Sequence, residues 1–279
     1  MDAKSQRSNV SRYLGLSLGG AKSDRTSLAI IDLYTEQKKL FLVDVLTDLG
    51  ADEDQTADQV LVGAIEKFCS EADTKVLAVD VPLTYPPCLH SCEKDCSGYE
   101  TCKRPEVKWM RNYFTKAKEK NSKLKHFTPY TQRPVDLYFR IKFQTKDVFQ
   151  DDTMGANLAP QAARMSYLKK FLKDLNLVEV WPKLVLYHIH RAIKVSKSDV
   201  MGYRNIERGS SARENILEHL VRHSPLFVYE RDMKRLVSNV GAFDALICAW
   251  IAMLHDQDQT EVFDEDLPLE SGWIELPRL

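Results

Sequence analysis

The sequence lacks the features that carry a chain into or across a membrane. No stretch reaches about eighteen uninterrupted apolar residues, and the opening segment MDAKSQRSNVSR has no apolar core of a signal peptide. We therefore expect neither membrane insertion nor secretion. A cytoplasmic location is the corresponding expectation.

The chain also lacks a large net charge of either sign, because 39 basic residues face 40 acidic ones and leave a formal charge of -1. This balance excludes a uniformly basic nucleic-acid binder. The charges are nevertheless unevenly distributed, with thirteen Lys and Arg against three acids in 103–146, and eight acids against one Arg in 256–279. We expect the first segment to attract phosphates or to form a solvated lysine-rich helical face, and the second to be a solvated acidic tail.

Cysteine is sparse, but four of the six cysteines are clustered. Cys88, Cys92, Cys96 and Cys102 are separated by gaps of three, three and five residues. In a reducing compartment such a cluster favours a metal over disulfides, and four thiolates complete a tetrahedral structural Zn²⁺ site. His90 could replace one of them. Metal-free thiols are the second interpretation and an iron–sulfur cluster the third.

Strand patterns open the chain at 13–18, 26–33 and 39–45, and the short links between them predict an antiparallel meander. A capping box at Thr56 and Gln59 predicts a helix that returns the chain to a fourth strand at 76–81. This order predicts an α/β fold with a mixed five-stranded sheet, helices on both faces, and the first strand beside the fourth. By analogy it is the order of a ribonuclease-H-like domain.

The length allows one elaborated domain or two small ones, and we expect a single domain over 1–279. Within it, 84–148 would be a cysteine-rich and basic insertion, because the prolines after the fourth strand lead the chain out over the sheet edge. Residues 256–279 would form the acidic tail.

Three apolar elements each contain a single acid: Asp80 in VLAVDV, Glu179 in VEVWP and Asp244 in GAFDALICAWIA. Each could be structural, since Asp80 could cap the proline turn, Glu179 could pair with a buried arginine, and Asp244 could lie at the positive end of its helix. A buried carboxylate is costly without a partner, so gathering the acids would satisfy them together. We expect Ser17, Asp80, Glu179 and Asp244 to converge in one cleft beside the basic segment.

The segment FTPYTQRP at 127–134 mixes aromatic, hydroxyl and guanidinium groups, which stack on bases and contact phosphates. Tyr130, Gln132 and Arg133 are therefore candidate substrate-binding residues. A structural loop braced by prolines would have the same composition.

Together, LGLSLGG, LAVDVPLTYPP, VEVWPK and GAFDALICAWIA resemble domain-of-unknown-function family 429, predicted nucleases of the ribonuclease-H-like superfamily. The resemblance implies an acidic catalytic site made of Asp80, Glu179 and Asp244. The first strand of the family usually reads Gly-x-Asp, whereas this chain has Gly15-Leu16-Ser17.

Phosphodiester hydrolysis of this kind uses Mg²⁺ or Mn²⁺, and a carboxylate commonly bridges two such ions. Ser17 is uncharged and cannot serve as a bridging carboxylate. Either one metal ion is enough for hydrolysis, or Asp24 supplies the missing carboxylate, or the site no longer has nuclease activity. The sequence therefore predicts a metal-dependent phosphodiester hydrolase acting on nucleic acid. The alternative is a non-catalytic adaptor that binds nucleic acid or protein. If Gly15 to Gly20 formed a kinase-like phosphate-binding loop, the chain would also need a second such loop. Gly202 and Gly209 do not provide one.

Overall fold

The computed structural model describes residues 10–20, 25–90, 92, 95–143, 152–155, 158–205 and 207–279. Its strands are β1 (Val10–Ser17), β2 (Ser27–Tyr34), β3 (Lys39–Leu46), β4 (Asp73–Val79), β5 (Asn176–Glu179) and β6 (Leu226–Phe227). Its helices are α2 (Ala57–Glu71), α3 (Pro87–His90), α4 (Pro105–Lys120), α5 (Pro134–Phe143), α6 (Leu158–Leu168), α7 (Pro182–Ile189), α8 (Lys197–Gly202), α9 (Gly209–His223), α10 (Glu230–Ser238), α11 (Val240–Asp256) and the short 3₁₀ helix η2 (Leu269–Ser271).

The described strands form one mixed sheet with the order β5-β4-β1-β2-β3-β6. β1 pairs antiparallel with β2 and parallel with β4, which confirms the predicted meander and the predicted neighbour of the first strand. The expectation of five strands was wrong by one. β6 adds to β3 through only two residues, Leu226 and Phe227, and so short a strand leaves no alternating pattern in the sequence.

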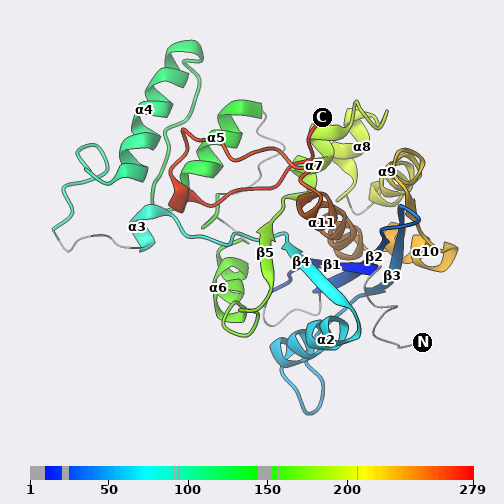
Figure 1. The fold of residues 1–279 in the computed structure, drawn as a ribbon. Helices are drawn as coiled ribbons and strands as arrows, with labels where there is room; N and C mark the ends of the chain where they lie inside the picture. The colour runs from blue at the N-terminus through cyan, green and yellow to red at the C-terminus, as the bar shows by residue number, and fades with distance from the viewer. Residues whose placement is uncertain are drawn as a thin grey trace.

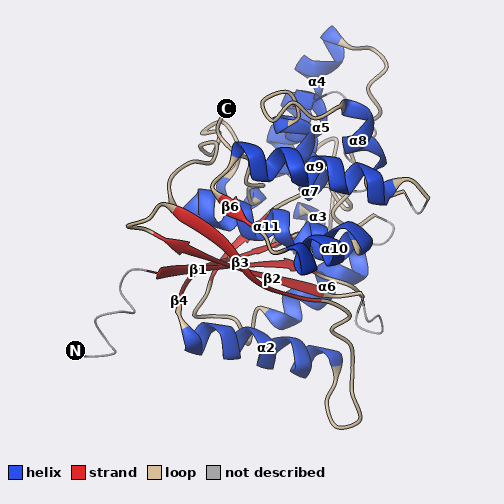
Figure 2. Cartoon of the chain, turned by 90° about the vertical axis from the view of Figure 1, so that its right-hand side faces the viewer, coloured by secondary structure: helices blue, strands red, loops and turns tan. Residues whose placement is uncertain are grey.

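Helices cover both faces of the sheet, as predicted (Figures 1 and 2). Side chains alternate along β1, so that Tyr13 joins one apolar cluster while Leu14 and Leu16 join the other. The first cluster lies under α11 and its neighbouring helices, and the second lies against α2 and α6. The sheet is therefore a middle layer that is buried on both sides.

The predicted capping box starts α2, because the Thr56 hydroxyl accepts from the Gln59 amide while the Gln59 side chain accepts from the Thr56 amide. On the opposite face, α11 is buried continuously from Ala242 to Leu254. It crosses β1 at Gly15, where a Cβ atom would lie only 2.1 Å from the Ala245 carbonyl oxygen and from the Ala249 amide nitrogen. Only glycine permits this approach of helix backbone to strand backbone.

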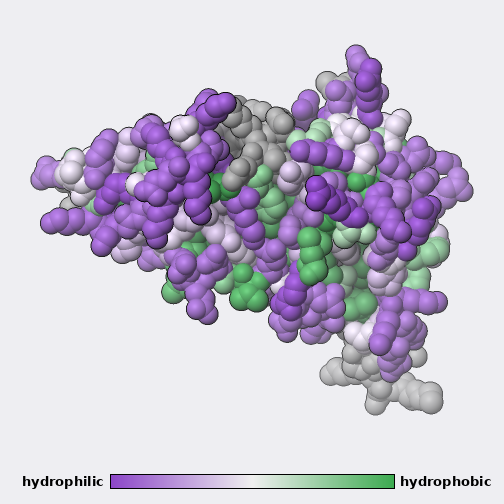
Figure 3. Space-filling model, turned by 90° about the horizontal axis from the view of Figure 1, so that it is seen from above, coloured by the Kyte–Doolittle hydropathy of each residue, from purple (hydrophilic) through white to green (hydrophobic). Residues whose placement is uncertain are grey.

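The predicted insertion contains α3, α4 and α5, which project from one end of the sheet (Figure 1). Met110, Phe114, Phe127 and Leu137 form a small apolar cluster there. Seen from above, the end of the molecule where α4 lies is covered mainly by hydrophilic side chains (Figure 3). The exposed lysines of α4 therefore form a solvated helical face.

The expectation of a fully solvated tail was wrong. Leu267, Ile274 and Leu276 are buried in the main core, and Ile274 bridges to Glu179 at the edge of the sheet. The acids lie between these apolar residues, so the count of charges concealed a segment that packs. Among the described residues no single helix has the length and apolarity needed to cross a membrane, although α10 and α11, bent by 115°, meet the length and composition test as a pair.

The contact at Gly15 makes a prediction about stability. Gly15→Ala should lower the free energy of unfolding by about 3 kcal/mol, because the added methyl group meets backbone atoms that cannot rotate away. Urea unfolding measures this change. Gly63→Ala in α2 is the control, since its methyl group meets nothing within 4 Å and should stabilise by about 0.5–1 kcal/mol. Equal stability of Gly15→Ala and the parent chain would contradict the packing.

Candidate functional site

Three of the four residues expected to converge lie together at the carboxyl ends of the central strands. Ser17 is the last residue of β1, Asp80 directly follows β4, and Asp244 lies near the start of α11. β1 and β4 are parallel, so their carboxyl ends meet at one edge of the sheet. We refer to Ser17, Asp80 and Asp244 as the acid cluster.

Asp80 is held by β1. The Ser17 hydroxyl donates to Asp80 Oδ2 at 2.7 Å, and the Leu18 amide donates to Oδ1 at 2.8 Å. Burial raises the pKa of Asp80 to about 6, and the charge of Asp244 raises it as well, against the effect of these two hydrogen bonds and of Arg204. A carboxyl group with this pKa is mostly ionised at neutral pH and is readily protonated in mild acid.

Asp244 is held by the turn after α8. The Tyr203 hydroxyl donates to Asp244 Oδ1 at 2.8 Å, and Arg204 Nη2 donates to Oδ2 at 2.7 Å. Burial raises the pKa of Asp244, although the charge of Arg204 opposes the shift. The Asp244 side chain is 4% exposed and that of Arg204 is 40% exposed, so part of the Arg204 side chain reaches the surface while its guanidinium balances the acid.

The donor set limits the metal that could bind here. Two carboxylates and the Ser17 hydroxyl suit one Mg²⁺ or Mn²⁺, which keeps most of its water ligands. Within the described ranges, no group of three or more His, Cys, Asp or Glu side chains could hold a metal ion, so these residues do not supply a two-metal site. Asp24, the suggested substitute acid, lies outside the described residues.

The structure does not bring Glu179 to the acid cluster. Glu179 accepts from Arg133 Nη2 and Nη1, both at 2.7 Å, from the Leu83 amide at 2.9 Å and from the Trp181 indole at 3.0 Å. Both carboxylate oxygens are therefore occupied. Pairing with a buried arginine, the structural interpretation of Glu179, is the one observed.

The register of the sheet explains this separation. Glu179 pairs with Val79, which packs on the α2 side, and residues paired in a parallel register project to the same face. Asp80 follows Val79 and projects toward α11 on the other face. Glu179 and Asp80 thus share an edge of the sheet but lie on opposite faces.

Arg133 is the centre of a buried charge network, not an exposed phosphate ligand. Its five N–H groups are directed to Asp136, Glu179 and Thr84, and its side chain is 0% exposed. Burial alone would lower the pKa of Arg133, but the charges of Asp136 and Glu179 raise it. We refer to Arg133, Asp136 and Glu179 as the arginine hub.

The two other candidates for substrate binding differ from one another. Gln132 is buried, where its amide donates to Asp152 and its oxygen accepts from the Thr128 amide. Tyr130 is 53% exposed and remains free to stack. Arg133 and Gln132 therefore have structural partners, because the segment folds as a loop braced from within.

The four clustered cysteines are close enough to affect one another. Burial raises the pKa of the Cys88 thiol, and the charges of Cys92, Cys102 and Cys96 raise it further. Contact with Cys96 raises the pKa of Cys92. In the described part of the chain, however, no metal-holding group of three such side chains is formed, so zinc binding would require the thiols to move closer. The side chain of His90 is not among those described.

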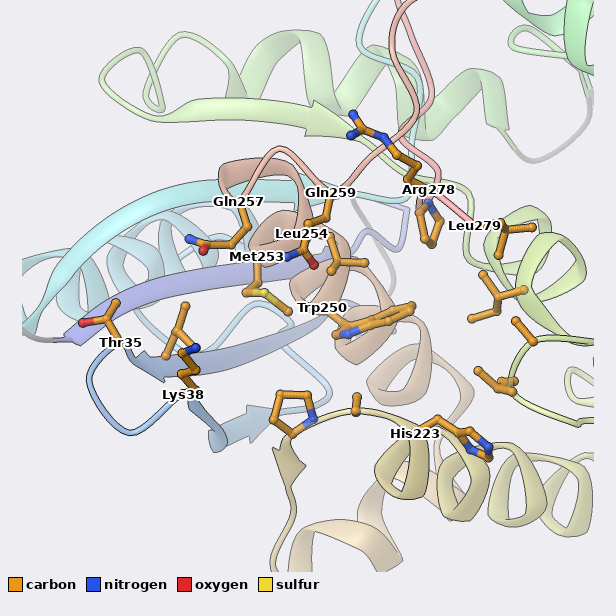
Figure 4. A pocket seen from close by; sticks show the side chains of 17 residues that line it. Thr35, Lys38, His223, Trp250, Met253, Leu254, Gln257, Gln259, Arg278 and Leu279 are labelled. Atoms are coloured by element: carbon orange, nitrogen blue, oxygen red, sulfur yellow. The ribbon is translucent and has the colours of Figure 1, made fainter.

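A separate cavity of about 830 Å³ lies at the other end of α11, around Trp250, Met253 and Leu254 (Figure 4). Lys38 and Arg278 line it, and no acidic side chain does. It is distant along α11 from Asp244 and contains none of the predicted site residues.

Sequence reasoning missed Tyr203 and Arg204, which hold Asp244. They follow α8 in a turn with no apolar periodicity, and no spacing links them to an acid 40 residues later. Cys248 is buried one helical turn after Asp244. Burial and the charges of Asp80 and Asp244 raise its pKa well above the ordinary value.

The sequence matches the model of a known protein family. The family model described as "Protein of unknown function (DUF429)" matches residues 26–267. The chain belongs to this family. No curated protein and no solved structure matches it. In this DUF429 chain the match includes Asp80, Glu179 and Asp244, whereas β1 and Ser17 precede the matched range.

The contacts within the arginine hub predict that Glu179 stabilises the fold of the DUF429 chain. Glu179→Gln should lower the free energy of unfolding by about 3 kcal/mol, since it leaves the buried Arg133 with one carboxylate in place of two. Chemical denaturation measures the loss. Glu71→Gln is the control, because that side chain is 45% exposed and 3.4 Å from Arg12, and its loss should cost less than about 1 kcal/mol. A variant of unchanged stability would refute the structural role.

The spacing of the four clustered cysteines predicts that the chain binds one structural zinc ion. Protein prepared without oxygen should contain about one zinc ion per chain by elemental analysis, and Cys92→Ser should lose it because a structural site needs four ligands. Cys69→Ser, outside the cluster, should keep it. Iron in place of zinc would favour the iron–sulfur interpretation, and the absence of both metals would leave free thiols.

Proposed function

We propose that this chain is a divalent-metal-dependent phosphodiester hydrolase acting on nucleic acid, with Asp80 and Asp244 as its metal-holding carboxylates. The observation that carries the proposal is the pairing of these two acids, in which the charge of Asp244 adds to burial in raising the pKa of Asp80 to about 6. Two adjacent carboxylates balanced by one partly exposed arginine attract a further cation.

The topology supports a ribonuclease-H-like fold for the same chain. A meander of β1, β2 and β3 is followed by the crossover helix α2 and then by β4 and β5, both parallel to β1. Ligands of open α/β sheets bind outside the carboxyl ends of the strands. The acid cluster lies at that edge.

The acid cluster, its hydrogen-bond partners and the lysines of α4 each have a specific role in this proposal. A bound Mg²⁺ would polarise the phosphoryl oxygen and acidify a water ligand. Asp80 and Asp244 would hold the ion, while Tyr203 and Ser17 orient their carboxylates. Arg204, with 40% of its side chain exposed, would contact a non-bridging phosphate oxygen. The lysines of α4 would attract the polyanion without reading its sequence.

A non-catalytic adaptor is the second candidate, and specific observations favour it. Ser17 replaces the first-strand acid, and both oxygens of Asp244 already accept hydrogen bonds from Tyr203 and Arg204. In an adaptor, Arg204 would serve as the permanent cation of the cluster. Such a protein would bind nucleic acid or protein without a divalent ion.

Calorimetric titration with Mn²⁺ tests the two candidates. Asp80→Asn should weaken Mn²⁺ binding at least about tenfold and preserve the fold, because the amide can accept from Leu18 and donate to Ser17. Affinity in the parent chain should fall as the pH drops through about 6, since protonated Asp80 no longer attracts cations. Ser17→Asp should strengthen binding.

The matched control is Asp73→Asn, at the opposite end of β4, where the acid is 59% exposed. It should bind Mn²⁺ like the parent chain. Cleavage of single-stranded RNA and DNA should follow the same order, with a loss above about 100-fold in Asp80→Asn. Retention of nucleic-acid binding without Mn²⁺ binding would support the adaptor instead.

A further inference from the structure

The cavity around Trp250, Met253 and Leu254 opens beside the last turns of α11, between the turn that joins β2 to β3 and residues 277–279 (Figure 4). Its volume of about 830 Å³ is typical of cavities that bind small molecules, which measure about 300–1,000 Å³. More than half of the lining residues are apolar, and Trp250, Met253 and Leu254 belong to the main apolar cluster. The core of the protein therefore borders open space at this end of the helix.

Trp250 brings an unused hydrogen-bond donor to this cavity. The residue is 8% exposed, and its indole N–H has no acceptor among the described residues. The indole nitrogen of Trp273 is fully buried without such a partner, whereas that of Trp250 retains accessible surface. The open space beside Trp250 is the cavity that it lines. Because an indole N–H donates and never accepts, a ligand atom that meets it must be an acceptor.

Lys38 supplies a positive charge at the same cavity. It lies in the turn between β2 and β3, and it forms no ion pair with a carboxylate of the described residues. No acidic side chain from these residues lines the cavity. Since apolar walls screen charges less than water does, an ammonium beside them attracts an anion. A neutral ligand would leave this charge unpaired, and a cationic ligand would be repelled.

The other polar groups of the lining change this balance little. Arg278 donates through Nη2 to the Thr260 carbonyl oxygen at 3.1 Å, and Figure 4 shows its guanidinium directed away from Trp250. His223 holds its ring Nδ1 at 2.8 Å from a carbonyl oxygen of its own helix. Leu279 lies across the cavity from Lys38 (Figure 4). A ligand therefore meets one unpaired ammonium, which matches one carboxylate better than a doubly charged phosphate ester.

We propose that this cavity binds a small organic acid that has one carboxylate on an apolar body. The carboxylate pairs with Lys38, and the apolar body lies against Trp250, Met253 and Leu254. Oxygen atoms of the ligand supply the acceptors that the Lys38 ammonium and the Trp250 N–H do not find among the described residues. Burial of the apolar body removes both its surface and the cavity wall from water, which favours binding.

Matched ligands test the chemistry of the proposal by titration calorimetry. Octanoate, octanol and octylammonium share one alkyl chain and differ in the charge of the head group. The parent chain should bind octanoate at least about tenfold more tightly than the other two. 4-Phenylbutanoate replaces the alkyl chain by an aromatic body and should bind if the cavity prefers a ring. Failure of both carboxylates to bind, or equal affinity for the three alkyl ligands, overturns the proposal.

A pair of lysine variants assigns the preference for a carboxylate. Lys38→Met keeps an unbranched apolar side chain and removes the charge, so it should lower the affinity for octanoate to that for octanol. Lys39→Met is the matched control, because Lys39 is the next residue and does not line the cavity. It should keep the preference of the parent chain. A preference that survives Lys38→Met overturns the assignment to Lys38.

Trp250 reports occupancy of the cavity through its fluorescence. Octanoate should change the tryptophan emission of the parent chain, and Trp250→Phe should lose this change and weaken binding. Trp109→Phe, in α4, should keep both. An undiminished response in Trp250→Phe would place the ligand elsewhere and overturn the site. Thermal unfolding checks each variant, and if Trp250→Phe fails to fold, the exposed Lys38 and Lys39 variants still decide.

Octanoate binding is independent of the hydrolase proposal. Asp80→Asn should bind octanoate like the parent chain, since Asp80 does not line the cavity. Loss of Mn²⁺ binding with retained octanoate binding would therefore separate the two sites.

Discussion

The contact between α11 and β1 at Gly15 is the constraint on which the candidate site depends. Because Gly15 has no side chain, the backbone of α11 lies directly on the central strand, with Ala245 and Ala249 at the crossing. Asp244 immediately precedes Ala245, so the same crossing carries this acid over the end of β1 and toward Asp80. The geometry of two carboxylates on different elements thus follows from one residue that neither of them contacts.

The buried charges of the arginine hub and those of the acid cluster are balanced in two different ways. At the arginine hub, five N–H donors face two carboxylates and a hydroxyl group, so each charge has its partners and the network is complete. At the acid cluster two carboxylates share one arginine whose side chain is partly exposed, and burial raises the pKa of both acids. Complete networks stabilise a fold, whereas an unbalanced one at an accessible edge is suited to binding a cation.

Much of this arrangement could be predicted from the sequence, because it rests on local patterns. The pattern of apolar residues and the short links between the segments predicted β1 to β4. The capping box of Thr56 and Gln59 predicted the start of α2. Single acids in apolar elements identified Asp80 and Asp244. The arginine partners could not be predicted, since Arg204, which pairs with Asp244, and Arg133, which pairs with Glu179, come from loops whose composition also suits a surface. Glu179 resembled Asp80 in sequence, and only the strand register places the two on opposite faces.

The five residues from Asp80 to Thr84 connect the acid cluster to the arginine hub. Asp80 belongs to the acid cluster, the Leu83 amide donates to Glu179 of the hub, and the Thr84 hydroxyl accepts from Arg133 and donates to the Ser271 carbonyl. A hub with every donor occupied fixes this segment, so the hub and the acid cluster are held in a constant relation.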